Sequence, residues 1–275
     1  MLLLDTDHLP PASRMDAYRN MAIAEAGMCG IEHEGDADTR FHKRMEAWYF
    51  GPVTLFRTRG SGMRYWQTPA HLRRDSWDTV SLMTQTTGAG GFGWGGLQRR
   101  LTSADIALAG KSVGPWECRW SGTGESLALM FDADRLGLSD GMVRSAIPRI
   151  PHSEITPLVL AHLHALGVDA DRLATDAGAE AIGDSVIALV RALVASVADG
   201  AASRDVVEES RLPVILAYAR SHLHEPDLTL ARIAAAHDLS LRRLYRVCEA
   251  GGLDLADWIT GQRRRAVRRA TRRGV

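Results

Sequence analysis

The sequence predicts an α+β protein in which a β-rich region is followed by a helical C-terminal region. Short runs of β-forming residues broken by glycine fill residues 51–131, a pattern typical of a barrel or a sandwich. From residue 132 onward, apolar residues instead recur at helical spacing. Residues 229–250 predict two short helices about a tight turn, with Thr229 and Ser240 as N-caps.

Length and composition limit the class of protein. The 275 residues allow one large or two modest domains, and their apolar content is ordinary for a globular protein. The three cysteines are widely spaced and form no CxxC motif, so neither a disulfide framework nor a zinc site is predicted. The first residues lack the basic flank of a signal peptide, and no apolar run approaches a membrane span. We therefore expect a cytoplasmic protein that has no membrane partner.

The net charge of zero hides an asymmetry along the chain. Residues 1–200 carry 19 Lys and Arg against 24 Asp and Glu, whereas residues 201–275 carry 14 Arg against 9 acidic residues. From Ser240 onward there are 10 Arg and 3 acidic residues. Such a field favours an anionic partner. Nucleic acid is a better candidate than a membrane, because the charge begins on a helix whose other face is apolar.

Seven strands are expected in the β-rich region: Pro52–Arg57, Arg64–Gln67, Thr79–Thr86, Gly91–Trp94, Asp105–Ala109, Trp116–Trp120 and Ser126–Phe131. Six of the seven tryptophans lie between residues 48 and 120. Their default role is to fill the core, and the alternative is an aromatic ligand pocket that uses Trp66, Trp94, Trp116 and Trp120. The GxGxxG pattern of Gly88–Gly93 is followed by more glycine instead of a helix, so it predicts a hairpin and no dinucleotide site.

Four longer helices are expected at Met15–Met28, Ser153–Gly167, Ala179–Ala198 and Val206–His224. In the third, an apolar stripe can pack on the β-rich region or form a dimer seam; it consists of Ile182, Val186, Leu189, Leu193 and Val197. The small residues at 200–203 predict a linker. The expected domains are therefore residues 1–200 and residues 201–275.

The second helix of the 229–250 pair is strongly amphipathic. At 100° per residue its apolar face holds Leu241, Leu244, Val247 and Cys248, and its polar face holds Arg242, Tyr245, Arg246 and Glu249, with Arg243 on the flank. An apolar face packed on the first helix and a basic polar face is the form that enters a major groove. An ordinary pair of helices at the edge of a helical domain is the alternative. A further helix follows, with Leu255, Trp258 and Ile259 on its apolar side and arginines 263–265, 268, 269, 272 and 273 on its polar side.

These C-terminal residues resemble the AraC/XylS family of bacterial transcription regulators. The resemblance rests on Thr229–Ala234, Leu239–Arg246, Gly252 and Trp258–Ile259, and more loosely on Pro69–Asp75, Ser103–Leu108 and Asp132–Leu136. It implies an N-terminal cupin-like β-barrel with helical dimerisation elements, followed by an all-α helix-turn-helix domain. It also implies that Arg242, Tyr245 and Arg246 read bases and that Ser240 and Arg243 contact phosphates.

The resemblance also implies a set of partners and shows three departures. The expected partners are double-stranded DNA, a small effector, a second copy of the chain and RNA polymerase. Cys248 replaces the family's usual phenylalanine, and Arg264 replaces a usually buried leucine. The chain reaches Val275 before a second helix-turn-helix, so we expect an incomplete DNA-binding domain.

The sequence therefore predicts a transcription regulator that is not an enzyme and needs no metal or cofactor. A first rival is a DNA-incompetent remnant that dimerises with an intact homologue or sequesters its effector. A second rival is a cupin-like barrel enzyme, against which the expected strands carry no His-x-His motif and no carboxylate cluster.

Overall fold

The computed structural model describes residues 1–35, 40–75, 78–111, 113–198, 212–237, 239–250 and 253–273. Its contacts divide the chain into two compact units. The first, here called the sheet unit, comprises residues 1–133 and 144–197, and the second, the helical unit, comprises residues 134–143 and 198–275. The expected linker at 200–203 lies outside the described residues.

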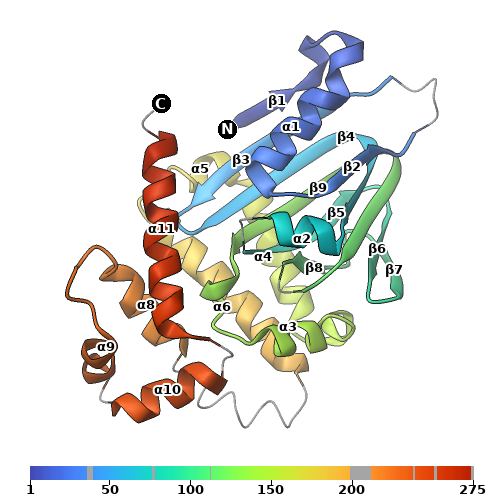
Figure 1. The fold of residues 1–275 in the computed structure, drawn as a ribbon. Helices are drawn as coiled ribbons and strands as arrows, with labels where there is room; N and C mark the ends of the chain where they lie inside the picture. Colours follow the sequence, from blue (N-terminus) through green and yellow to red (C-terminus); the bar gives the residue numbers. More distant parts are fainter. Residues whose placement is uncertain are drawn as a thin grey trace. The chain divides into compact units, whose positions relative to one another are not determined.

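The described part of the sheet unit holds nine antiparallel strands (Figure 1). They are β1 (Leu2–Asp5), β2 (Gly30–His33), β3 (Lys43–Phe50), β4 (Val53–Gln67), β5 (Thr79–Thr87), β6 (Gly90–Trp94), β7 (Leu97–Leu101), β8 (Ala107–Gly110) and β9 (Trp116–Asp132). The spatial order is β1-β3-β4-β9-β5-β8, with β2 also beside β4, and β6 between β9 and β7. This large antiparallel sheet is consistent with the expected cupin-like N-terminal domain.

The long strands β4 and β9 connect the two halves of the sheet. They pair along nearly their whole length, and the register shifts between Ser61 and Met63. Gly62 is required at this shift, because a Cβ there would lie 2.6 Å from the carbonyl oxygen of Trp120. β3 and β5 flank the part of the pair before the shift in β4, and β2 and β6 flank the part after it.

The expected strands were too short where glycines lie inside β4 and β9. The runs 52–57 and 64–67 belong to one strand, and the runs 116–120 and 126–131 belong to another. Glycine marks the bend in each strand and does not end it, which is why the sequence pattern misplaced these boundaries. The GxGxxG segment lies at the β5–β6 turn and in β6, and β6 pairs with β7 as the expected hairpin.

The sheet unit also contains α1 (Arg14–Ala26), α2 (Pro69–Arg74), α4 (Thr156–Val168), α5 (Ala170–Leu173) and α6 (Ala179–Val197), with 3-10 turns at Thr6–His8, Pro11–Ser13 and Ile150–His152. The 3-10 turn Ala133–Arg135 and α3 (Asp140–Ala146) stand where the chain passes between the two units. α6 packs against α4, β3 and β4. Of its expected stripe, Val186 and Leu193 are buried, whereas Ile182, Leu189 and Val197 are only half-buried. The stripe therefore serves intramolecular packing, and a dimer seam stays a prediction.

The helical unit contains α8 (Leu212–Ser221), α9 (Leu230–Ala236), α10 (Leu241–Ala250) and α11 (Leu255–Arg273). Both expected N-caps are confirmed: Thr229 Oγ1 accepts from Arg232 N at 3.2 Å, and Ser240 Oγ accepts from Arg243 N at 3.2 Å. All four helices share one apolar core, whose central members include Leu216, Ile233, Leu244, Val247 and Ile259. No helix in the described ranges is long and apolar enough to cross a bilayer.

A carboxylate joins two of these helices. Asp134 accepts hydrogen bonds from Trp258 Nε1 at 2.8 Å and from Gln262, both on α11, and its other oxygen lies 3.2 Å from Arg220 Nη2 on α8. The Arg220 guanidinium also lies 5.3 Å from the centre of the Trp258 ring. Asp134 follows β9 by two residues in the chain, so a residue far from the C-terminal helices in sequence holds them together.

Candidate functional sites: an interior cavity and an exposed basic helix

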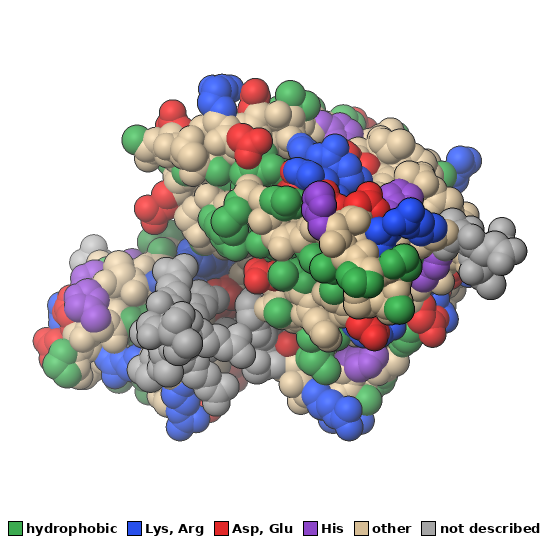
Figure 2. Space-filling view, turned by 90° about the horizontal axis from the view of Figure 1, so that it is seen from above, with side chains coloured by type: hydrophobic (Ala, Val, Ile, Leu, Met, Phe, Trp, Pro, Cys, Tyr) green, Lys and Arg blue, Asp and Glu red, His purple; other side chains and the backbone are tan. Residues whose placement is uncertain are grey.

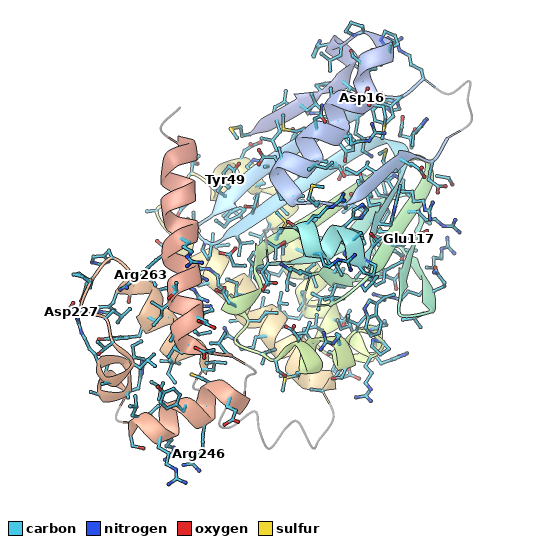
Figure 3. All side chains as sticks on the ribbon, in the orientation of Figure 1. Asp16, Tyr49, Glu117, Asp227, Arg246 and Arg263 are labelled. Carbon is cyan, nitrogen blue, oxygen red and sulfur yellow. The ribbon has the colours of Figure 1, made fainter. Side chains whose placement is uncertain are left out.

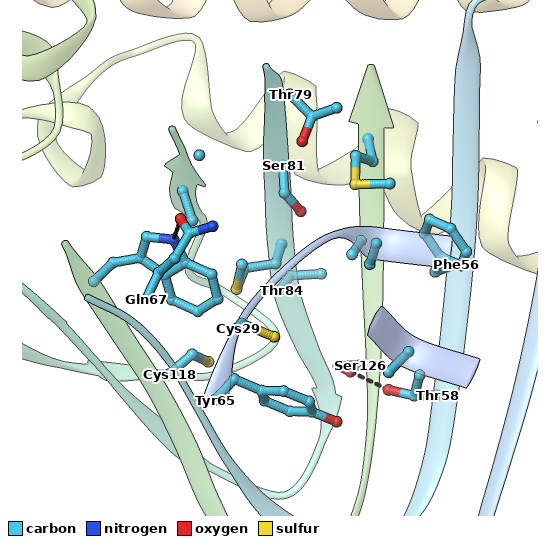
Figure 4. A pocket seen from close by; sticks show the side chains of 18 of the residues that line it. Cys29, Phe56, Thr58, Tyr65, Gln67, Thr79, Ser81, Thr84, Cys118 and Ser126 are labelled. Carbon is cyan, nitrogen blue, oxygen red and sulfur yellow. Dashed lines mark hydrogen bonds between the residues drawn. The ribbon is translucent and has the colours of Figure 1, made fainter. Parts of the chain in front are cut away.

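The sheet unit contains a cavity between its strands and α1 (Figure 4). The cavity has a volume of about 150 Å³, similar to an engineered apolar cavity that holds benzene. Its walls are largely apolar and rich in sulfur and aromatic rings; they include Met28, Met45, Phe56, Met83, Trp116 and Trp120. The cavity is therefore suited to a small, mostly apolar molecule.

Two of the four tryptophans expected in a ligand pocket line this cavity. Trp116 and Trp120 do, and Trp66 and Trp94 do not. Successive side chains of a strand point to opposite faces, so Trp66 points away while its neighbour Tyr65 lines the cavity. The indole of Trp66 covers Gly30, and that of Trp94 donates from Nε1 to the carbonyl oxygen of Val113 at 2.9 Å.

One wall of the cavity is a closed hydrogen-bond network. Trp116 Nε1 donates to Gln67 Oε1 at 2.9 Å, and Gln67 Nε2 donates to the Met28 carbonyl oxygen at 3.0 Å and to Asp75 Oδ2 at 3.4 Å. Asp75 Oδ2 also accepts from the Met28 amide, and Lys111 Nζ donates to the Asp75 carbonyl oxygen at 3.1 Å. These groups are already occupied, so they fix the wall and are poor candidates for ligand contacts.

Four hydroxyls, here called the hydroxyl chain, lie on the wall formed by α1, β4 and β9. Tyr18 and Tyr65 share a hydrogen bond of 2.5 Å, and Thr58 and Ser126 share one of 2.7 Å. In Figure 4 the Tyr65 hydroxyl points toward the Thr58–Ser126 pair. Burial raises the pKa of Tyr18 and of Tyr65, so both phenols stay protonated. No sequence pattern predicted this cluster, because its members come from distant segments.

The second candidate site is the outer face of α10. Leu244, Val247 and Cys248 are buried in the core of the helical unit, whereas the expected DNA-contacting residues Ser240, Arg242, Arg243, Tyr245 and Arg246 are all exposed. In Figure 3 the side chain of Arg246 points away from α8 and α9. Leu241 departs from the expected pattern: it was assigned to the apolar face but is 42% exposed, because it begins the helix outside the core.

The arginines of α11 divide into two groups. Arg263 was expected on a free polar side, but it is half-buried and donates to the carbonyl oxygens of Leu223, at 3.0 Å, and of Glu225, at 2.6 Å. It therefore stabilises the turn after α8. Arg264 is exposed, and the side chains of the arginines from 265 onward lie outside the described residues.

Residues 19–195, which contain the sheet and its cavity, match the AraC-binding-like domain. The chain belongs to this family. No curated protein matches it in sequence. Among solved structures, the AraC-like transcriptional activator CuxR is 16% identical with a TM-score of 0.61, and the match covers 98% of this chain and 94% of CuxR. At this identity the likeness shows a shared fold.

Two further solved structures match a smaller part of the chain. One is the cupin domain of an XRE-family transcriptional regulator from Enterobacter cloacae, 14% identical, with a TM-score of 0.26 and covering 32% of this chain and 95% of that one. The other is KdgF from Halomonas, also 14% identical, with a TM-score of 0.26 and covering 32% and 77% of the two chains.

The AraC-binding-like domain places two thiols on the cavity wall. Burial raises the pKa of Cys29 and of Cys118 to about 12, so both are neutral thiols at physiological pH. Among the described residues no three His, Cys, Asp or Glu side chains gather as a metal site. The thiols are therefore part of the apolar lining.

The same domain buries one amine without a carboxylate partner in the described ranges. Lys43 is 1% exposed, and its Nζ donates to the Ser61 carbonyl oxygen at 2.9 Å and lies 4.5 Å from the centre of the Trp120 ring. Burial lowers the pKa of Lys43 to about 7. The amine lies behind the cavity wall and does not line the cavity itself.

Proposed function

We propose that this chain is a transcription regulator in which the cavity of the AraC-binding-like domain binds a small effector and α10 binds duplex DNA. It acts without a catalytic step, as a cytoplasmic protein that pairs with a second copy and contacts RNA polymerase. The α9–α10 pair is then a helix-turn-helix. The likeness of the whole chain to CuxR, itself a transcriptional activator, supports this proposal.

The observation that carries the proposal is the two-sided nature of α10. Its inner face is committed to a core shared with α8, α9 and α11, which fixes the helix at the surface. Its outer face offers Arg242, Tyr245 and Arg246 at helical spacing, and Tyr245 is 53% exposed. A rigid helix that presents arginines on one face suits a major groove, where arginine pairs with guanine.

Each residue of this face has a role that follows from its position. Arg242, Tyr245 and Arg246 are proposed to contact base edges. Ser240 and Arg243 stand at the first turn of α10, where backbone amides and the helix dipole favour a phosphate. The arginines of α11 after Arg263 would add phosphate contacts that do not depend on sequence.

The test is a gel-shift titration of the full chain on duplexes that it selects from a random pool, at two salt concentrations. Arg246→Ala should reduce the preference for selected over random duplex by about tenfold, because one bidentate base contact contributes about 1–3 kcal/mol. The salt dependence should change little. Replacing Arg268, Arg269, Arg272 and Arg273 together should flatten the salt dependence and leave the preference intact.

Arg232→Ala is the matched control. Arg232 belongs to α9 and is paired with Glu225 at 2.6 Å and with Asp227 at 2.9 Å, so its loss should not alter preference. Equal effects of Arg246→Ala and Arg232→Ala would reject the assignment of α10. A parent protein that binds no duplex even at low salt would favour the alternative, a DNA-incompetent protein that dimerises or sequesters an effector.

A further inference from the structure

The hydroxyl chain of the cavity has more protons than its own hydrogen bonds can use. Tyr18 is bonded to Tyr65, and Thr58 is bonded to Ser126, so two hydrogen bonds use two protons. Four hydroxyls supply four protons. Two O–H groups therefore have no acceptor among the described residues, and they lie on the wall of a cavity large enough for a small molecule.

An indole donor on the same wall is also unused. Trp120 is 4% exposed and lines the cavity, and its Nε1 has no acceptor in the described part of the chain. An indole N–H can only donate. A buried donor without an acceptor costs about 1–3 kcal/mol, so an occupant that supplies an acceptor is favoured over one that does not.

The charges of the lining argue for a neutral occupant. The charged residues among the described lining are Asp75 and Lys111, which have opposite signs and lie on the wall of the Trp116–Gln67 network. Near the hydroxyl chain the wall consists of Phe56, Met45, Met130 and neutral phenols and alcohols. An ion placed there would lose its hydration without gaining a counter-ion on the wall.

We infer that the cavity takes an uncharged, mainly apolar small molecule with an oxygen acceptor, such as an aromatic ketone or aldehyde, and that this oxygen accepts from the hydroxyl chain. This inference rests on the proposed effector role of the cavity and specifies the chemical class of the effector. The apolar body lies among the methionines and Trp116, and the Lys43 amine is not needed for binding.

Three probes of similar size test the class: para-fluorinated acetophenone, ethylbenzene and benzoate, each titrated with the full chain and followed by fluorine NMR. They differ in carrying a neutral acceptor, no acceptor and a negative charge. The ketone should bind at least fivefold tighter than the hydrocarbon, and the carboxylate should bind weakest. Equal affinities for ketone and hydrocarbon, tightest binding of the carboxylate, or binding of none of the three would overturn the inference.

The variant Tyr18→Phe/Thr58→Val/Tyr65→Phe/Ser126→Ala removes all four hydroxyls and leaves no half of a pair behind. It should bind ketone and hydrocarbon within about twofold of each other, and retained hydrocarbon binding reports an intact cavity. If the hydrocarbon is lost too, the infrared carbonyl frequency of the ketone bound to the parent decides: a red shift from its value in hexane supports the inference, and no shift refutes it.

Thr175→Val/Ser185→Ala is the control for hydroxyl loss, because both residues are exposed in the sheet unit and do not line the cavity. It should keep the parent's preference for the ketone. The gel-shift titration is independent of these measurements. A protein that binds the ketone but no DNA would refute the proposed regulator and support the inferred ligand class. A protein that binds DNA but shows no preference for the ketone would support the regulator and refute the ligand class.

Discussion

The sheet unit and helix α10 of the helical unit use arginine in opposite ways. In the sheet unit Glu46 pairs with Arg44 at 3.0 Å and with Arg59 at 2.9 Å, and Arg64 pairs with Glu117 at 2.9 Å. Blue and red side chains accordingly lie next to one another in Figure 2. On α10, Arg242 and Arg246 form no ion pair with any described residue. Paired charges cancel one another and give the surface little net charge. Exposed arginines without an ion pair are available to an anionic partner.

The interiors of the two units differ as well. The sheet unit buries polar groups deeply: Arg14 is 1% exposed and bonds to Asp7 and to the carbonyl oxygens of Leu9 and Phe41, whereas Lys43 has a single carbonyl acceptor. Among the described residues, the buried polar side chains all lie in the sheet unit, and the half-buried carboxylate of Asp134 lies beside the apolar core of the helical unit. Its stability should therefore depend on a few groups.

The largest expected effect on stability comes from replacing Asp134. Asp134→Ala removes the acceptor of Trp258 Nε1 and of Gln262 and leaves the Arg220 guanidinium, 17% exposed, without its counter-charge. Losing one partner of a buried pair costs about 3–5 kcal/mol. In chemical denaturation the helical unit should unfold at a lower denaturant concentration than in the parent. Hydrogen exchange of α8 and α11 reports this unfolding.

Asp227→Ala is the control for this prediction. Asp227 pairs with Arg232, but its side chain is 74% exposed, and such pairs contribute less than about 1 kcal/mol. If the two variants unfold alike, Asp134 does not hold α8 and α11 together, and the contrast between the two interiors fails.

A second prediction compares two helical glycines, one in each unit. A Cβ at Gly183 of α6 would lie 1.9 Å from the Phe50 carbonyl oxygen of β3, whereas a Cβ at Gly261 of α11 would meet nothing within 4 Å. Gly183→Ala should cost about 2–3 kcal/mol by forcing the helix off the sheet. Gly261→Ala should stabilise its helix by about 1 kcal/mol. Thermal unfolding of both variants checks the opposite signs, and two shifts of the same sign would contradict the close packing of α6.

The third prediction concerns the pH dependence of the sheet unit. The pKa of Lys43 is lowered from 10.5 to about 7 by burial, so between these values the unfolded chain binds the extra proton. Stability should therefore rise with pH across this window. Lys43→Met should be stabilising at about pH 6, and this advantage should shrink by about 2.5 kcal/mol at about pH 9.

Lys111→Met serves as the control for Lys43, because Lys111 is only half-buried. Denaturant titrations at the two pH values give the comparison. Parallel stability profiles for the parent and Lys43→Met would show that the amine is not buried as a neutral group.

The sequence predicted the helical unit better than the sheet, for a physical reason. The apolar face of α10 consists of residues three and four apart in the sequence, so one short stretch is enough to predict that Leu244, Val247 and Cys248 are buried. The bends of β4 and β9 depend instead on pairing between strands about sixty residues apart, which local glycine content does not reveal. Four strands, β1, β2, β3 and β7, were not expected for the same reason.

The cavity was predicted only in part. Tryptophan content pointed to the sheet unit and correctly to Trp116 and Trp120, but the alternation of side chains along each strand removed Trp66 and Trp94 from the lining. The hydroxyl chain includes Tyr18 of α1 and Ser126 of β9, which are more than a hundred residues apart in the sequence. Such a cluster exists only once the tertiary fold brings its segments together.

The place of Asp134 in the chain restricts how this protein can be recombined with others. The segment Asp134–Val143 belongs to the helical unit although it is synthesised before α4 and α6 of the sheet unit. A chimera joined at residue 200 would take its C-terminal helices from one parent. The carboxylate that accepts the hydrogen bond of Trp258 Nε1 would come from the other parent. Exchange of the C-terminal helices among relatives should therefore succeed only where the recipient already carries an acid at this position, or where the ten-residue segment is exchanged with them.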